Sequence, residues 1–277
     1  MRVTIIFILM LAAVLIGNAC HTSNTNLLET PLIQSATDDD KAKTNAKRAM
    51  PVIVELFTSE GCSSCPPADK ILAILNRNNS VENVEIIVLS EHVDYWNRLG
   101  WKDPFSSSQY SNRQSEYSQF FEKNGNVYTP QMVVDGTREF VGSNAGEALK
   151  SIGEAAKNEK GDVAVEVEKL ENNTAQLKIK IENLPKMSKN DRAIALLAVT
   201  EDNLSTKVTR GENSGSELPH VGVVRWMQNI GSVTQENKTF SHTLVIDKNW
   251  KQENLNAVVF VQESGSRKII GAAKIKL

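Results

Sequence analysis

The chain has 277 residues, of which 40% are hydrophobic and 23% charged, and its formal net charge at pH 7 is −2. This length exceeds that of one average domain and suggests about two. The composition is that of ordinary globular proteins, and the small net charge argues against nucleic acid as a partner. No Gly-rich phosphate loop, zinc-ligand spacing or internal repeat is present in the sequence, so no cofactor is expected.

Residues 1–19 are predicted to be a signal peptide. Arg2 precedes a continuous apolar run from Val3 to Ile16, and Gly17-Asn18-Ala19 supplies small residues for cleavage. The run is shorter than the about 20 residues that a membrane-spanning helix needs. A short membrane anchor or a core helix is the alternative interpretation.

Cys20 follows the predicted cleavage site directly, an arrangement that resembles bacterial lipoproteins, whose cysteine is acylated. Gly17 departs from this pattern, because such signals usually carry Leu there, and plain secretion remains the alternative. Residues 20–50 are polar and charged and are predicted to form a disordered tether. We therefore expect a cell-envelope protein, periplasmic or an outer-membrane lipoprotein, that contacts the membrane only through a lipid anchor on Cys20. Disulfides persist in that compartment.

Two cysteines stand where a strand turns into a helix. Val52–Phe57 is apolar and β-branched and predicts a strand, Gly61 marks the turn, and Cys62 and Cys65 follow with two residues between them. The two prolines after Cys65 are tolerated only in a first helical turn, so the helix begins at or near Cys65. Unpaired N–H groups at a helix N-terminus favour thiolate, which indicates a dithiol suited to redox chemistry.

A second strand and a polar, aromatic segment come next. Val84–Leu89 is short and apolar, and the crossover of this length predicts that it pairs parallel to the first strand. The segment after it holds His92, Asp94 and Trp96 at the carboxyl end of the strand, where ligands of open α/β sheets bind. These three residues are candidates for binding substrate. The alternatives are that the polar pair anchors the loop and that Trp96 packs on the sheet.

Tyr128-Thr129-Pro130 leads into a third strand, 131–134. A proline at the first residue of a strand is tolerated, and X-Pro bonds are where cis peptides occur. Asp135-Gly136 predicts a hairpin turn to a strand at 138–141, and Asn144 predicts an N-cap for a helix to about residue 157. Residues 106–121 predict a further helix before this hairpin.

The order strand, Cys-x-x-Cys helix, strand, helix, Thr-Pro strand, hairpin strand and helix resembles thioredoxin-like proteins over residues 51–157. Three blocks are more closely similar to a family of secreted bacterial thioredoxin-like proteins catalogued as a domain of unknown function. They are Glu55–Asp69 with its Cys-Ser-Ser-Cys-Pro-Pro-Ala-Asp signature, His92–Trp96 and Tyr128–Gln131. The resemblance implies an α/β thioredoxin-like domain at residues 51–160.

The resemblance also implies roles for individual residues. Cys62 would be the attacking cysteine and Cys65 the resolving one, while Pro130 would be a cis-proline facing the disulfide and Thr129 would offer backbone bonds to an extended substrate. The pair encloses Ser63-Ser64 where thioredoxin has Gly-Pro, and two prolines follow Cys65. The redox potential and the pKa of Cys62 therefore stay open.

The remaining residues, 161–277, alternate apolar and polar side chains without intervening helices. This pattern predicts an all-β sandwich-like domain of about seven strands. A long polar loop region within it carries Arg210, Glu212, His220 and Arg225 and resembles stretches of the same family. These residues are either an interdomain salt-bridge network or a substrate-recognition surface.

Three functions fit the sequence. The first is a cell-envelope thiol–disulfide oxidoreductase that acts on protein or small-molecule thiols and disulfides. The second is a Cu(I)-handling protein, with Met132 or His92 adding to the two thiolates. The third is a non-catalytic binding protein in which the Cys62–Cys65 disulfide is structural. The oligomeric state is not predicted.

Overall fold

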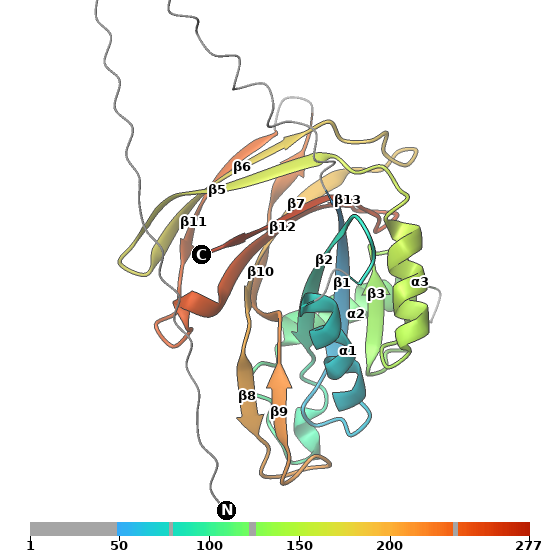
Figure 1. Cartoon of the computed structure of the whole chain (residues 1–277), viewed down its shortest axis with the longest axis vertical. Coiled ribbons are helices and arrows are strands. Elements are labelled where there is room, and N and C mark those ends of the chain that lie inside the picture. The colour runs from blue at the N-terminus through green and yellow to red at the C-terminus, as the bar shows by residue number, and fades with distance from the viewer. Residues whose placement is uncertain (1–48, 78–79, 122–125, 235–237) are drawn as a thin grey trace, which may run out of the picture. The chain divides into compact units, whose positions relative to one another are not determined.

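The computed structural model describes residues 49–77, 80–121, 126–234 and 238–277 (Figure 1). Residues Lys47–Leu277 form one compact unit. The predicted signal peptide, most of the predicted tether and Cys20 lie outside the described residues. Within the described ranges, no helix has the length and apolar character needed to cross a membrane.

Residues 50–155 contain three α-helices and four strands. They are β1 (Met50–Thr58), α1 (Pro66–Arg77), β2 (Val84–His92), α2 (Ser108–Phe120), β3 (Gln131–Val134), β4 (Arg138–Val141) and α3 (Ala145–Ala155). The predicted order of these elements is confirmed, and β1 and β2 are parallel, as their crossover length required. The α3 N-cap is also confirmed, because the Asn144 side chain accepts a hydrogen bond from the N–H of Glu147.

The described residues between 162 and 276 form strands joined by turns and by one short 3₁₀ helix. The strands are β5 (Asp162–Glu171), β6 (Thr174–Glu182), β7 (Ala193–Glu201), β8 (Leu204–Lys207), β9 (Glu217–His220), β10 (Val223–Val233), β11 (Thr239–Val245), β12 (Leu255–Glu263) and β13 (Ile269–Lys276). Strands β5 and β6 pair in an antiparallel register and form a hairpin.

The predicted fold class, an α/β thioredoxin-like domain followed by a separate all-β sandwich-like domain, is wrong. Strands from both halves of the chain join in one mixed eight-stranded sheet, in the order β13-β12-β7-β10-β2-β1-β3-β4. The link is the edge of β2, where Ser90 pairs in parallel with Val223 of β10 and donates its N–H to the carbonyl of Gly222. Alternation in a sequence tells which face of a strand is apolar but not which edge its neighbour occupies, so this continuation was missed.

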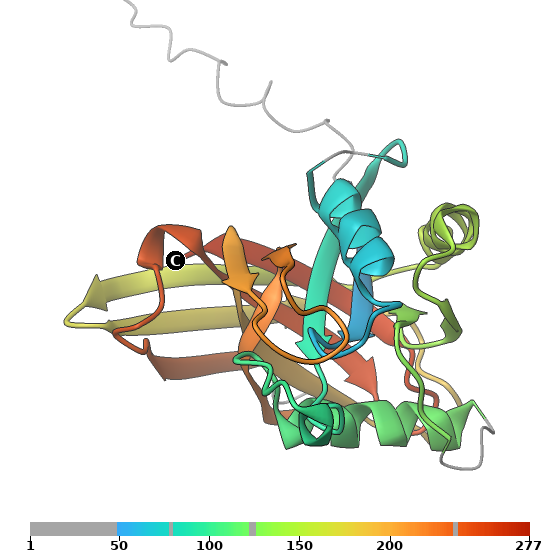
Figure 2. The ribbon, with the colours of Figure 1, turned by 90° about the horizontal axis from the view of Figure 1, so that it is seen from below.

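Apolar layers cover both faces of the large sheet. Helices α1 and α3 pack through Leu72, Leu75 and Ile152 on one face of the first-half strands, and α2 packs through Tyr110 on the other (Figure 2). Tyr110 shares its cluster with Ile53 of β1 and Phe260 of β12, so α2 spans strands from both halves. The three-stranded sheet β11-β6-β5 packs on β7, β12 and β13 through a further apolar cluster.

The two-stranded ribbon β8–β9 stands apart from both larger sheets and lies beside α1 (Figure 1). The loop at its tip, residues 208–216, is closed by two backbone hydrogen bonds: the N–H of Val208 donates to the carbonyl of Ser216, and the N–H of Gly215 donates to the carbonyl of Val208. The ribbon therefore carries a segment of the second half toward the turn that bears the two cysteines.

Candidate functional site

Cys62 and Cys65 form a disulfide in the turn between β1 and α1, with their Cα atoms 5.5 Å apart. The N–H of Cys62 donates to the carbonyl of Ser59, and the carbonyl of Cys65 accepts the N–H groups of Ala68 and Asp69. Helix α1 thus begins immediately after Cys65, and the two prolines do not delay it. Both cysteines are 0% exposed.

Thr129 and Trp96 border the disulfide on one side. The Cys62 Sγ atom lies 3.9 Å from the carbonyl oxygen of Thr129, and the Ser64 hydroxyl lies 3.5 Å from the same oxygen. The Trp96 Nε1–H donates to the Thr129 hydroxyl at 2.8 Å. The Thr129–Pro130 peptide bond is cis. The structure therefore brings five of the predicted site residues together: Cys62, Cys65, Trp96, Thr129 and Pro130.

The 208–216 loop covers the disulfide turn from another side. The Asn213 Nδ2 group donates to the carbonyls of Glu60 and Cys62 at 2.9 and 3.0 Å, and the Glu212 carboxylate accepts the N–H of Ser63 at 2.9 Å. Hydrogen bonding to the side chain and the backbone N–H of Ser63 holds the pKa of Glu212 below its usual range. We call residues 208–216 the cap loop, because it shields the cysteine turn with residues from the other half of the chain.

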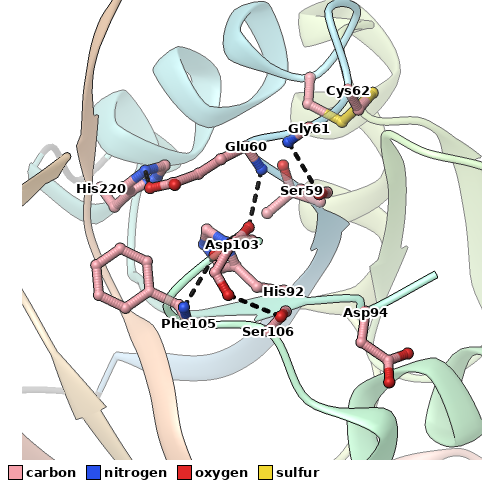
Figure 3. Close-up of polar contacts among 12 residues, drawn as sticks. Ser59, Glu60, Gly61, Cys62, His92, Asp94, Asp103, Phe105, Ser106 and His220 are labelled. Carbon is pink, nitrogen blue, oxygen red and sulfur yellow. Dashed lines mark hydrogen bonds and ion pairs between the residues drawn. A yellow bond between two sulfur atoms is a disulfide. The ribbon is translucent and has the colours of Figure 1, made fainter. Parts of the chain in front are cut away.

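Glu60 is the centre of a buried polar cluster behind this turn (Figure 3). Its carboxylate accepts from Trp101 Nε1 at 2.8 Å and lies 3.0 Å from His220 Nε2. Its N–H donates to Asp103 Oδ2 at 2.8 Å, and the same oxygen lies 2.7 Å from His92 Nδ1. The rings of His92 and His220 meet edge to face, with centroids 4.9 Å apart.

Charge and burial act against one another on the groups of this cluster. Burial alone would lower the pKa of His92, but the adjacent Asp103 carboxylate outweighs burial and raises it. Burial alone would raise the pKa of Asp103, but His92 and two backbone N–H groups lower it. Asp69, on the first turn of α1, keeps a raised pKa because burial outweighs the two histidines and its bond from the Thr58 hydroxyl.

The other predicted substrate-binding residues lie elsewhere. His92 is 0% exposed and faces Asp103 and His220, so in this conformation it contacts no molecule outside the protein. Asp94 points away from the Glu60 cluster (Figure 3) and accepts from the Ser111 hydroxyl in α2 at 2.6 Å. Arg225 lies over the rings of Phe105 and Trp250.

A metal site was the second hypothesis for the two cysteines. Among the residues that the structure describes, no group of three or more His, Cys, Asp and Glu side chains is arranged to hold a metal ion. Cu(I) handling stays a prediction from the Cys-x-x-Cys spacing.

A family model described as a protein of unknown function, DUF1223, matches residues 53–262. The chain belongs to the DUF1223 family. The match covers both halves of the chain, in agreement with the shared sheet. No curated protein matches the sequence.

Two solved structures share the fold of this DUF1223 protein. A protein of Agrobacterium tumefaciens superposes with a TM-score of 0.60 at 24% identity, over 81% of this chain and 93% of the other. HBP35 of Porphyromonas gingivalis superposes with a TM-score of 0.58 at 14% identity, over 83% of this chain and 76% of the other. At these identities the likeness concerns the fold alone.

Only part of the remaining site could be recognised from the sequence. Glu212 and His220 stood out as polar residues in a long loop region, and both contact the cysteine turn or Glu60. Glu60, Asp103 and Asn213 were missed, because each acts across more than forty residues of sequence, as the separations of 43 and 153 residues in their hydrogen bonds show. A polar residue directly before the Gly-Cys turn was the one available signal for Glu60.

Proposed function

We propose that this DUF1223 protein is a thiol–disulfide oxidoreductase of the cell envelope, working by the dithiol chemistry of thioredoxin-like oxidoreductases. The observation that carries the proposal is the Cys62–Cys65 disulfide at the N-terminus of α1, with Cys62 Sγ against the Thr129 carbonyl of a separate segment. A helix N-terminus stabilises thiolate, and an adjacent backbone segment offers hydrogen bonds to an extended substrate.

In the reducing direction, the Cys62 thiolate attacks one sulfur of a substrate disulfide. The substrate S–S bond breaks, a mixed disulfide forms on Cys62, and the departing substrate thiolate takes up a proton. The Cys65 thiolate then attacks Cys62 Sγ, which releases the second substrate thiolate and restores the Cys62–Cys65 disulfide. The substrate gains two electrons and the cysteine pair loses two. The oxidising direction is the reverse of these steps.

The cap loop sets a condition on this chemistry. Since Cys62 and Cys65 are both 0% exposed, a substrate sulfur reaches them only after the turn or the cap loop moves. The bonds from Asn213 and to Glu212 are the contacts that such a movement breaks. Substrates would be protein or small-molecule thiols and disulfides that meet the site in its open form.

The same burial favours a second candidate, a non-catalytic binding protein in which the disulfide only staples the turn. Structural disulfides resist reduction, with potentials below about −300 mV. In that case the cap loop and its neighbours would serve to hold the two halves together.

The reduction potential of the cysteine pair separates the two candidates. The oxidoreductase has a potential above about −300 mV and turns over insulin or a model peptide, and Cys62→Ser abolishes turnover. Cys65→Ser should arrest mixed disulfides on Cys62, which identifies the partner by its mass. A potential below that limit, with no turnover and no trapped partner, establishes the structural disulfide.

A further inference from the structure

A cleft of about 440 Å³ opens between α1 and the β8–β9 ribbon, on the far side of Pro66 from the cysteine turn. Figure 1 shows the two elements side by side, with β9 facing α1. Most of the exposed surface of the wall is apolar, and its apolar side chains include Ala73 of α1 and Leu204, Leu218, Pro219 and Val221 of the second half. Small-molecule sites have volumes of about 300–1,000 Å³, with mostly apolar walls and a few polar groups, and this cleft has both properties.

Two cations line one side of the cleft. Lys70 and Arg77 lie seven positions apart on α1, so they occupy the same face of the helix, about 10 Å apart along its axis. Across the described ranges, neither side chain has an ion-pair or hydrogen-bond partner in the structure. They are therefore available to a negatively charged group in the cleft.

The two carboxyl groups in the wall, unlike the two cations, each have a hydrogen-bond partner within the protein. Asp69 accepts a hydrogen bond from the Thr58 hydroxyl and Glu217 accepts one from the Ser205 hydroxyl, both at 3.0 Å. Burial also raises the pKa of Asp69. Among the described residues, the charged side chains of the wall that are left without a partner are thus both cations.

His220 is a further polar residue of the wall, and its ring can report on what the cleft holds. It lines the cleft and is 4% exposed, with its Nε2 atom held by Glu60 at 3.0 Å. Its Nδ1 atom is buried and has no hydrogen-bond partner among the described residues. A buried polar nitrogen without a partner costs free energy.

We propose that this cleft binds a small organic carboxylate, with its apolar body between α1 and β9 and its carboxylate facing Lys70 and Arg77. The proposal does not rest on the thiol–disulfide activity, since the argument uses no property of the cysteines. It assigns the β8–β9 ribbon a second role besides carrying the cap loop.

The test is titration of the protein with sodium octanoate, followed by calorimetry and by the NMR signals of the His220 ring. We expect one octanoate per chain and a shift of the His220 signals. Octanol lacks the charge and acetate lacks the apolar body. Each should therefore bind with an affinity at least about tenfold lower than that of octanoate. High salt should weaken octanoate binding, because the contacts to Lys70 and Arg77 are partly exposed.

Three variants locate the site. Replacing both cations, Lys70→Met with Arg77→Met, keeps most of the apolar stems and should weaken octanoate binding about tenfold. Ala73→Phe fills the cleft and should abolish binding, while thermal unfolding shows whether the fold is kept. Lys150→Met, on the exposed face of α3, is the matched control and should bind like the wild type.

Four results would overturn the proposal. They are no octanoate binding, equal binding of octanol, unchanged binding in the double cation variant, and unchanged binding in a folded Ala73→Phe protein. Binding of a peptide with an amidated C-terminus as tightly as octanoate would assign the cleft to a protein segment and would also overturn it.

Discussion

Asp103 accepts hydrogen bonds from three groups: His92 Nδ1 and the N–H groups of Glu60 and Phe105. It is 1% exposed and His92 is 0% exposed, so the pair has little water around it. Removing one partner of a buried ion pair costs far more than the pair itself contributes, because the other charge is left without compensation. The pair therefore fixes the segment after β2 behind the cysteine turn.

His92→Phe should destabilise the protein by about 3 kcal/mol at pH 5.5. The pKa of His92 is raised in the folded state, so its charged form stabilises the protein below the unfolded pKa of about 6.5 and loses this effect as pH rises through the folded pKa. The lowered pKa of Asp103 sets the acid limit, since its contribution is present above about pH 4 and is lost as pH falls through the folded value. Urea unfolding at pH 5.5 and pH 9 should thus show a smaller loss at pH 9.

His242→Phe is the control for this prediction. Burial lowers the pKa of His242, so its effect on stability has the opposite sign: wild-type stability relative to the variant increases as pH rises. If the loss in His92→Phe were equal at pH 5.5 and pH 9, charge on His92 would play no part in holding Asp103.

At the scale of elements, the joint between β10 and β2 depends on Gly222. Its φ is +59°, and a Cβ atom there would lie 2.7 Å from Val88 Cγ2 and 2.9 Å from the Val88 carbonyl oxygen. Its carbonyl accepts the N–H of Ser90, and its N–H donates to Asp202. One residue thus combines a left-handed backbone, a close approach to β2 and the hydrogen bond that starts the joint.

Gly222→Ala should lower the free energy of unfolding by more than about 1–2 kcal/mol, which is the cost of a left-handed backbone at a residue other than glycine. Gly215→Ala is the matched control, because Gly215 also has a positive φ, +86°, but nothing within 4 Å of the added methyl group. Urea unfolding of both variants separates strain from crowding. Equal losses in the two proteins would mean that the approach to Val88 is easily relaxed and that the joint is not sensitive to it.

The elements themselves were largely predictable. The apolar run of β1, the proline-marked start of α1 and the Asn144 cap are local signals, and local physics decided the outcome at each. The joint at Gly222 was not predictable, because a glycine before an apolar run looks the same whether it precedes an edge strand or one that enters another sheet. The wrong fold class came from that one unseen pairing.

At the scale of the whole molecule, the candidate site is assembled from both halves of the chain. The sequence located the cysteines, Thr129 and Pro130 in the first half, because Cys-x-x-Cys and Thr-Pro are short motifs. The cover over the disulfide comes from Asn213 and Glu212, 151 and 149 residues away from the groups they contact. No local pattern encodes a contact of that span, so the burial of the cysteines appeared only in the fold.

Asn213→Ala should make the disulfide more reactive. The two hydrogen bonds from Nδ2 to the carbonyls of Glu60 and Cys62 contribute about 0.5–1.5 kcal/mol each, so their loss should raise the open fraction about tenfold or more. A water-soluble phosphine should therefore reduce the Cys62–Cys65 disulfide faster by the same factor. The rate is measured by alkylating the freed thiols at successive times and determining the mass of the protein by mass spectrometry.

Ser214→Ala tests whether this effect comes from the cap loop's contact or from loosening the loop itself. The Ser214 hydroxyl donates to the Thr209 carbonyl within the same loop, and among the described residues it makes no hydrogen bond to the cysteine turn. If protection of the disulfide depends only on an ordered cap loop, Asn213→Ala and Ser214→Ala should increase the rate of reduction by the same factor. If the bonds from Asn213 shield the sulfurs, Ser214→Ala should be reduced at close to the wild-type rate.

An Asn213→Ala protein reduced no faster than the wild type would show that burial by the turn alone, without the second half of the chain, protects the disulfide.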